Sequence, residues 1–184
     1  MPTSSNLFFV TSNNHKFKEA ETILDSFNVK INFLKYSLEE IQSGSLEIIA
    51  SKKAKFAFSK FNKPLIIEDD GLFVESLNGF PGPYSSYVFD TIGNKGLLNL
   101  VKKNKKAKFV SFITYCDAKT TRSFIGIVSG SISKSPRGKG WGYDPIFVPD
   151  NTRKTFAELK NKNEFSHRYL ALKKFSNWYL RMPE

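Results

Sequence analysis

Three consecutive carboxylates, Glu68, Asp69 and Asp70, are the residues of this chain most able to do chemistry, because they interrupt the otherwise apolar and β-branched run 65–74. An ionised carboxylate near a core costs free energy unless a cation or hydrogen-bond donors meet it, so the pattern predicts a strand end that opens into a cleft. Mg²⁺ is the natural candidate for the positive partner, because a hard cation binds oxygen ligands and often arrives with phosphates. The alternative is a strand that ends in an acidic turn before Gly71.

A loop rich in glycine and proline, residues 79–86, follows this strand directly and carries aromatic side chains. Rigid loops at strand ends are common places for binding and catalytic sites. The loop therefore favours a site over a plain acidic turn.

A polar loop, residues 11–16, connects a predicted strand at 6–10 to a predicted helix. The helix is indicated by apolar residues at helical spacing, which are Phe17, Ala20, Ile23, Leu24 and Phe27. Hydroxyl and amide residues at a helix N-terminus, closed by Lys16, offer backbone N–H groups, the helix dipole and an ammonium to one anion. The loop lacks the Walker A pattern, and simple helix capping is the alternative to phosphate binding.

Lys53 is the lysine whose position in its predicted helix calls for an explanation. Ser45 can cap this helix, whose apolar face consists of Leu46, Ile49, Ala50, Ala54, Ala57 and Phe61. Lys53 lies four residues from both Ile49 and Ala57 and so falls on the apolar face. It needs an anionic partner, which the acidic strand or a ligand phosphate can supply, unless it snorkels to solvent.

The remaining pattern predicts alternating strands and helices. It consists of a strand at 29–34, helical pieces at 84–89 and 96–101 broken near Gly93, a hairpin at 108–117 and 121–131, a fixed turn at 141–149, and a last helix after Ser166.

Length and composition bound the protein class. The 184 residues fit one domain, 1–184, of one or two lobes, and an apolar content of 40% supports a substantial core. The single cysteine, Cys116, favours a reducing compartment. The chain shows no signal-peptide pattern and no apolar window of membrane-spanning length, so we expect a soluble, cytoplasmic protein without a membrane partner.

The formal net charge of +11 indicates anionic partners, which could be nucleic acid, a membrane surface or free nucleotides. The basic run 102–106 is typical of solvated surface, with nucleic-acid contact as the alternative. A module for single-stranded nucleic acid would not explain the acidic cluster, which would repel a phosphate backbone. The acidic cluster thus disfavours a nucleic-acid partner, and the net charge does not by itself choose among the partner classes.

Seven motifs occur in a fixed order along the chain, and together they extend from the first strand to the last helix. They are TSNNHK at 11–16, EIQ at 40–42, EDDGL at 68–72, GFPG with YS at 79–85, WGYDPIF at 141–147, TFAEL at 155–159, and SHR with AL at 166–172. In this order they closely resemble the inosine triphosphate pyrophosphatase family, whose members are also called aberrant-purine NTP pyrophosphatases.

The resemblance implies an α/β fold with a long twisted mixed sheet and flanking helices that form two lobes around a central nucleotide cleft, commonly in a homodimer. It also implies a reaction, the hydrolysis of ITP, dITP or XTP to the monophosphate and pyrophosphate. The alternative is the Maf-like nucleotide pyrophosphatase family, which has similar chemistry but acts on other bases. The turn at 141–144 and the segment at 166–168 favour the first family.

Site residues follow from the resemblance position by position. It implies that the triphosphate binds Thr11, Ser12, Asn13, Asn14, His15 and Lys16, with Lys53 and Asp70 nearby. Glu40 and Asp69 would hold Mg²⁺, with Glu68 as a further ligand, and Asp69 would also orient or deprotonate the attacking water. The base would meet Trp141, Gly142, Tyr143, Asp144, Lys162, His167 and Arg168.

Three positions depart from the family pattern. Asp70 stands where many relatives carry serine, His15 where they carry glycine, and Trp141 where they carry phenylalanine. Tryptophan still offers an aromatic face for stacking. Asp70 instead adds a charge beside the predicted phosphates.

Overall fold

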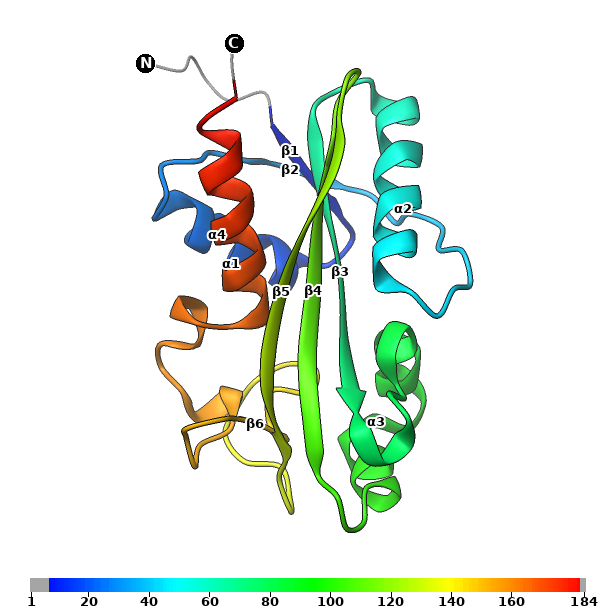
Figure 1. Ribbon diagram of the computed structural model, residues 1–184, viewed down its shortest axis with the longest axis vertical. Coiled ribbons are helices and arrows are strands. Elements are labelled where there is room, and N and C mark those ends of the chain that lie inside the picture. The colour runs from blue at the N-terminus through cyan, green and yellow to red at the C-terminus, as the bar shows by residue number, and fades with distance from the viewer. Residues whose placement is uncertain (1–6, 183–184) are drawn as a thin grey trace. The chain divides into compact units, whose positions relative to one another are not determined.

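The computed structural model describes residues 7–182 and contains a six-stranded mixed sheet with helices (Figure 1). The helices are α1 (Asn14–Asp25), α2 (Leu46–Phe61), α3 (Ser85–Leu100) and α4 (His167–Tyr179). The strands are β1 (Phe8–Thr11), β2 (Asn32–Lys35), β3 (Leu65–Val74), β4 (Lys106–Cys116), β5 (Thr121–Ile132) and β6 (Phe147–Pro149). Their order is β2-β1-β3-β4-β5-β6, with β1 parallel to β2 and β3, and β5 antiparallel to β6. The predicted mixed α/β class is confirmed.

The chain forms two compact units, and β3, β4 and β5 each contribute residues to both. The first unit comprises residues up to 69, then 111–126 and residues from 168 onward. The second comprises 70–110 and 127–167. That the units make up a single domain stays a prediction.

Both faces of the sheet are covered by helices in the first unit (Figure 1). On one face, α1 and α4 pack over a core that includes Phe9, Ile66 and Phe175. On the other face, three alanines of α2 pack with strand residues in a second core. This core contains Ala50, Ala54 and Ala57 of the helix, and Val10, Leu65, Ile67 and Cys116 of the strands. Each strand therefore sends alternate side chains into two different cores.

Local capping explains where the first two helices begin. The side chain of Asn13 accepts hydrogen bonds from the backbone N–H groups of His15 and Lys16 at the start of α1. Ser45 does the same for Ile48 at the start of α2, as the sequence predicts. Asn62 in the left-handed region then ends α2.

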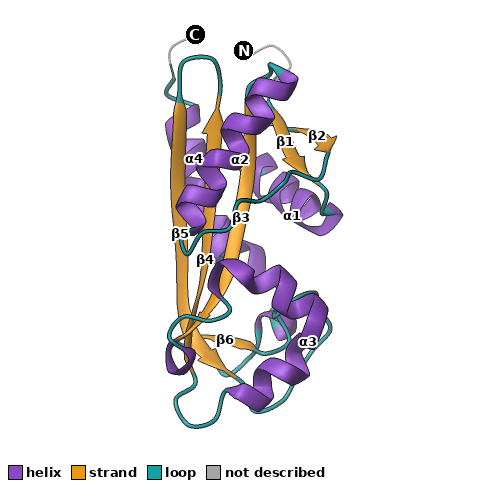
Figure 2. Ribbon diagram, turned by 90° about the vertical axis from the view of Figure 1, so that its right-hand side faces the viewer, coloured by secondary structure: helices purple, strands orange, loops and turns teal. Residues whose placement is uncertain are grey.

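The second unit contains α3 and β6 (Figure 2) around its own apolar core. The core contains Leu72, Val74, Leu97, Val101, Ala107, Phe109, Ile132, Tyr143, Ile146, Phe147 and Phe156. Gly93 (φ 60°, ψ −168°) interrupts α3, which confirms the predicted break. Helix α4 and the β4–β5 hairpin, both in part outside this unit, also agree with prediction.

Two strand boundaries differ from prediction. The expected strand at 29–34 is observed as β2 (Asn32–Lys35), because Asn28 has a positive φ and Val29 turns into the core instead. The first strand begins at Phe8, and Asn6 of the predicted range lies outside the described residues. None of the helices within 7–182 has the length and apolar character needed to cross a bilayer.

Candidate functional site

Lys53 joins two carboxylates in the first unit. Its ammonium lies 2.7 Å from Oε1 of Glu40 and 2.7 Å from Oδ1 of Asp69. The side chains of Lys53 and Asp69 are 11% and 9% exposed, whereas that of Glu40 is 54% exposed. The inward orientation predicted from helical periodicity is confirmed, and the snorkelling alternative is wrong.

Asp69 is the electrostatic centre of this cluster. Burial raises the pKa of its carboxyl above the ordinary value of 3.8, and the positive charges of Lys53 and Lys16 offset that rise only in part. The exposed Glu40 adds to the rise by repulsion. The second oxygen of Asp69, Oδ2, is buried and has no hydrogen-bond partner among residues 7–182. A buried carboxylate oxygen of this kind calls for a partner such as a cation or a water molecule.

Glu40 and Asp69 suit a hard divalent cation, because both present carboxylate oxygens. One of these oxygens, Oδ2 of Asp69, has no hydrogen-bond partner in the part of the chain that the structure describes. Glu68 does not join them. Within residues 7–182, no three side chains of His, Cys, Asp or Glu come together as a preformed metal cluster. The ligand set of Glu40, Asp69 and Glu68 stays a prediction, and the contacts of the described residues favour the first two.

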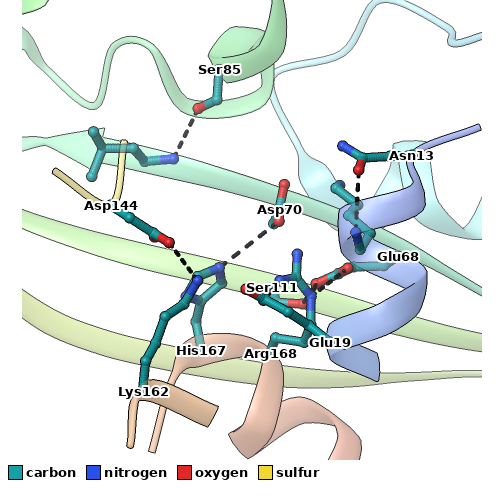
Figure 3. A network of polar contacts seen from close by, with 12 residues as sticks. Asn13, Glu19, Glu68, Asp70, Ser85, Ser111, Asp144, Lys162, His167 and Arg168 are labelled. Carbon is teal, nitrogen blue, oxygen red and sulfur yellow. Dashed lines mark hydrogen bonds and ion pairs between the residues drawn. The ribbon is translucent and has the colours of Figure 1, made fainter. Parts of the chain in front are cut away.

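The carboxylate of Glu68 is engaged elsewhere (Figure 3). Its oxygens accept hydrogen bonds from Nε of Arg168 at 2.8 and 2.9 Å, and Oε1 also accepts one from the hydroxyl of Ser111. Arg168 contacts Glu19 of α1 through Nη1 as well. The side chains of Glu68 and Arg168 are 0% and 1% exposed. Arg168 thus has the environment of a buried counterion. Its contact with the purine edge stays a prediction.

Side chains of the polar loop 11–16 cap helix α1 and the loop itself. Oδ1 of Asn13 accepts hydrogen bonds from the N–H groups of His15 (2.9 Å) and Lys16 (3.2 Å), and the hydroxyl of Thr11 accepts one from Asn13 N–H (3.1 Å). The capping alternative is thus observed. The side chain of Lys16 supplies positive charge at the end of the loop, and it lies close enough to Asp69 to lower the pKa of that carboxyl. Ser12 and Asn14 of this loop are exposed.

The turn at residues 141–144, called the aromatic turn below, carries a buried ion pair in the second unit (Figure 3). The ammonium of Lys162 lies 2.6 Å from Oδ2 of Asp144, and each side chain is 10% exposed. The same ammonium lies 5.7 Å from the ring centroid of Trp141 and 5.8 Å from that of Phe156. The structure thus places Lys162 beside the turn, and its contact with the substrate stays a prediction.

His167 lies in the same unit and is 2% exposed. Its ring stacks on Phe109, with centroids 4.4 Å apart and an interplanar angle of 7°. Nε2 lies 3.8 Å from Oδ2 of Asp70, and Nδ1 is buried without a hydrogen-bond partner among residues 7–182. The charge that distinguishes Asp70 thus faces an imidazole.

Two residues that fix the aromatic turn are not apparent from the sequence. Asn94 donates from Nδ2 to the carbonyl of Gly142 at 3.0 Å, where Gly142 has a φ of 59°. The hydroxyl of Tyr143 donates to the carbonyl of Ser85, whose own hydroxyl accepts from Leu72 N–H. In the sequence, the position of Asn94 directly after the helix-breaking Gly93 is the feature that could have indicated its contact with the turn.

The fold and site together define an α/β protein whose central strand carries an acidic cluster neutralised by lysine. The model of the Ham1 family matches residues 7–178, and the chain belongs to this family. The resemblance to aberrant-purine pyrophosphatases is thereby confirmed.

Curated relatives match almost end to end. A dITP/XTP pyrophosphatase of Methanopyrus kandleri is 45% identical over 179 residues, covering 94% of this chain and 95% of the relative. One from Thermococcus kodakarensis is 46% identical over 177 residues, covering 94% and 96%. Among solved structures, a HAM1 protein from Coxiella burnetii has a TM-score of 0.81 and 27% identity, with 96% of this chain and 100% of that chain covered.

Proposed function

We propose that this protein hydrolyses aberrant purine nucleoside triphosphates, namely dITP, XTP and ITP, to the nucleoside monophosphate and pyrophosphate. The observation that carries the proposal is the nearly full-length similarity to relatives named dITP/XTP pyrophosphatase, at 45% and 46% identity. The enzyme is accordingly a hydrolase of nucleotide metabolism. The comparisons do not favour the Maf-like alternative.

Residues of the first unit are assigned to the triphosphate. Lys16 and Lys53 supply positive charge beside Asp69, and charge of this kind stabilises the phosphate oxygens in the transition state of phosphoryl transfer. Glu40 and Asp69 are the residues that would hold Mg²⁺. The ion, when bound, supplies further neutralisation of phosphate charge.

Asp69 is assigned to the attacking water. Its Oδ2 is buried and has no hydrogen-bond partner within the described range 7–182, so it is available to accept a hydrogen bond from water. A carboxyl with a raised pKa is also a stronger base than an ordinary aspartate. In this assignment Asp69 orients the water toward the α-phosphorus and takes its proton, and pyrophosphate leaves.

Residues of the second unit are assigned to the base. Trp141 offers an aromatic face with the ammonium of Lys162 beside it, and His167, which stacks on Phe109, offers further hydrogen-bonding groups. The 6-oxo group of hypoxanthine or xanthine accepts hydrogen bonds, whereas the 6-amino group of adenine donates them. Donors such as the Lys162 ammonium therefore favour the oxo purines over adenine.

The Mg²⁺ cofactor, the homodimer and the cytoplasmic location remain predictions. Their support comes from the resemblance and the composition of the chain.

A substrate panel tests the proposal. The purified protein is assayed with Mg²⁺ against dITP, XTP, ITP, ATP, GTP and dUTP, with pyrophosphate and orthophosphate measured separately. We expect pyrophosphate from the first three at a kcat/KM well above that for ATP. Equal use of ATP or dUTP, or release of orthophosphate alone, would overturn the assignment.

A further inference from the structure

We propose that the ammonium of Lys53 serves as the counterion of the carboxylate pair Glu40 and Asp69, and that it lowers their affinity for a divalent cation until a triphosphate draws it away. The proposal rests on the function assigned above, and it concerns a step that precedes substrate hydrolysis.

The contacts of Lys53 carry the argument. One ammonium lies 2.7 Å from an oxygen of each carboxylate, so both acids share the same positive charge. These are the two residues that suit a divalent cation, and Lys53 reaches them from the apolar face of α2. Ala54 and Ala57 of that face are fully buried, which keeps the helix beside β3. The packing of α2 against the sheet therefore fixes the ammonium beside the two carboxylates, unlike the ammonium of a lysine on the exposed side of the helix.

Charge then dictates competition. Two carboxylates with one ammonium carry a net charge of −1, whereas the same carboxylates without it carry −2. A divalent cation is attracted more weakly by the first arrangement and is also repelled by the nearby ammonium. The cation can still reach the second oxygens of the two carboxylates, among them Oδ2 of Asp69. Lys53 therefore weakens cation binding through its charge, and this repulsion favours release of the ammonium.

The released ammonium gains a new role. It is tethered to α2 and remains close to the carboxylates, so a triphosphate oxygen is its natural next partner. The triphosphate should then help cation binding by drawing Lys53 away, and the cation should help triphosphate binding by the same factor. Lys53 would thus couple the two ligands and keep the carboxylates paired while neither is present.

The test measures Mn²⁺ binding to the nucleotide-free protein, by electron paramagnetic resonance of free Mn²⁺ at pH 8. Lys53→Met keeps the apolar stem and removes the charge, and Lys55→Met is the matched control because Lys55 is an exposed lysine of the same helix. We expect about ten-fold tighter Mn²⁺ binding by Lys53→Met, within the usual range of coupling between sites, and no change in the control. Equal or weaker binding by Lys53→Met would overturn the proposal.

A second variant and a second ligand state guard against a folding defect. Lys53→Gln retains a hydrogen-bond donor for the two carboxylates and should also bind Mn²⁺ more tightly than the wild type. A non-hydrolysable dITP analogue should tighten Mn²⁺ binding less in either variant than in the wild type, and an equal effect in all three would contradict the coupling. Failure of these measurements in a protein that hydrolyses dITP would refute the role of Lys53 alone, whereas absence of dITP hydrolysis by the wild type would refute the proposed function.

Discussion

Glu68 and Asp69 are consecutive residues of β3, yet their carboxylates lie on opposite faces of the sheet. Glu68 follows Ile66 toward α1 and α4 and pairs with Arg168, whereas Asp69 follows Ile67 toward α2 and pairs with Lys53. The alternation of side chains along a strand makes this separation unavoidable. Both carboxylate oxygens of Glu68 are thereby hydrogen-bonded within the protein, whereas Oδ2 of Asp69 has no hydrogen-bond partner among the described residues.

Arg168→Ala should destabilise the fold, because it leaves the buried Glu68 without its arginine and removes one contact of Glu19 as well. Loss of one partner of a buried ion pair costs ~3–5 kcal/mol, which urea unfolding can measure. Arg168→Lys should recover part of this stability and keep the ratio of kcat/KM for dITP to that for ATP. A stable Arg168→Ala protein with a lowered dITP to ATP ratio would instead support the purine-contact interpretation.

Asp69→Asn should abolish turnover while the protein stays folded, because the amide cannot take a proton from water and Lys53 keeps its contact with Glu40. A lost general base typically lowers the rate by about 10²–10⁴-fold. Steady-state pyrophosphate release from dITP measures the loss, and circular dichroism checks the fold. Near-normal turnover would remove Asp69 from the catalytic role.

The raised pKa of Asp69 also predicts how stability depends on pH. The folded state binds this proton more tightly than the unfolded state does, so ionisation of Asp69 costs stability as the pH rises from about 3.8 through the folded-state pKa. The melting temperature of the metal-free wild type, minus that of Asp69→Asn, should therefore fall as the pH increases across this window. The difference would rise with pH if Lys53 and Lys16 outweighed burial.

Helical and strand periodicity predicted part of the candidate site from the sequence alone. Lys53 is identified because it shares a helical face with Ile49 and Ala57, and that relation is local. The ion pair of Arg168 is not apparent from the sequence, because its partner Glu68 lies 100 residues away and no local pattern indicates that the two residues meet. Asn94 is missed for the same reason, since its contact with Gly142 spans 48 residues.

Lys162→Met should weaken recognition of the base more than it disturbs the phosphate chemistry. The variant keeps an apolar stem near Trp141 and Phe156 but removes the donor and leaves Asp144 without its 2.6 Å partner. We expect KM for dITP to rise by about ten-fold or more, as for a lost charged hydrogen bond, and the preference over ATP to shrink. Lys160→Met, at an exposed lysine two residues earlier, is the control and should behave as wild type. An unchanged dITP to ATP ratio in Lys162→Met would show that the base is read by other groups.

The most direct test of the account is the position of solvent oxygen in the products. Hydrolysis of dITP is run in H₂¹⁸O with Mg²⁺, and the monophosphate and pyrophosphate are separated and analysed by mass spectrometry. Attack at the α-phosphorus by a water that Asp69 orients places ¹⁸O in dIMP and leaves pyrophosphate unlabelled. Label in pyrophosphate, or the appearance of labelled orthophosphate as the first product, would contradict the proposed reaction.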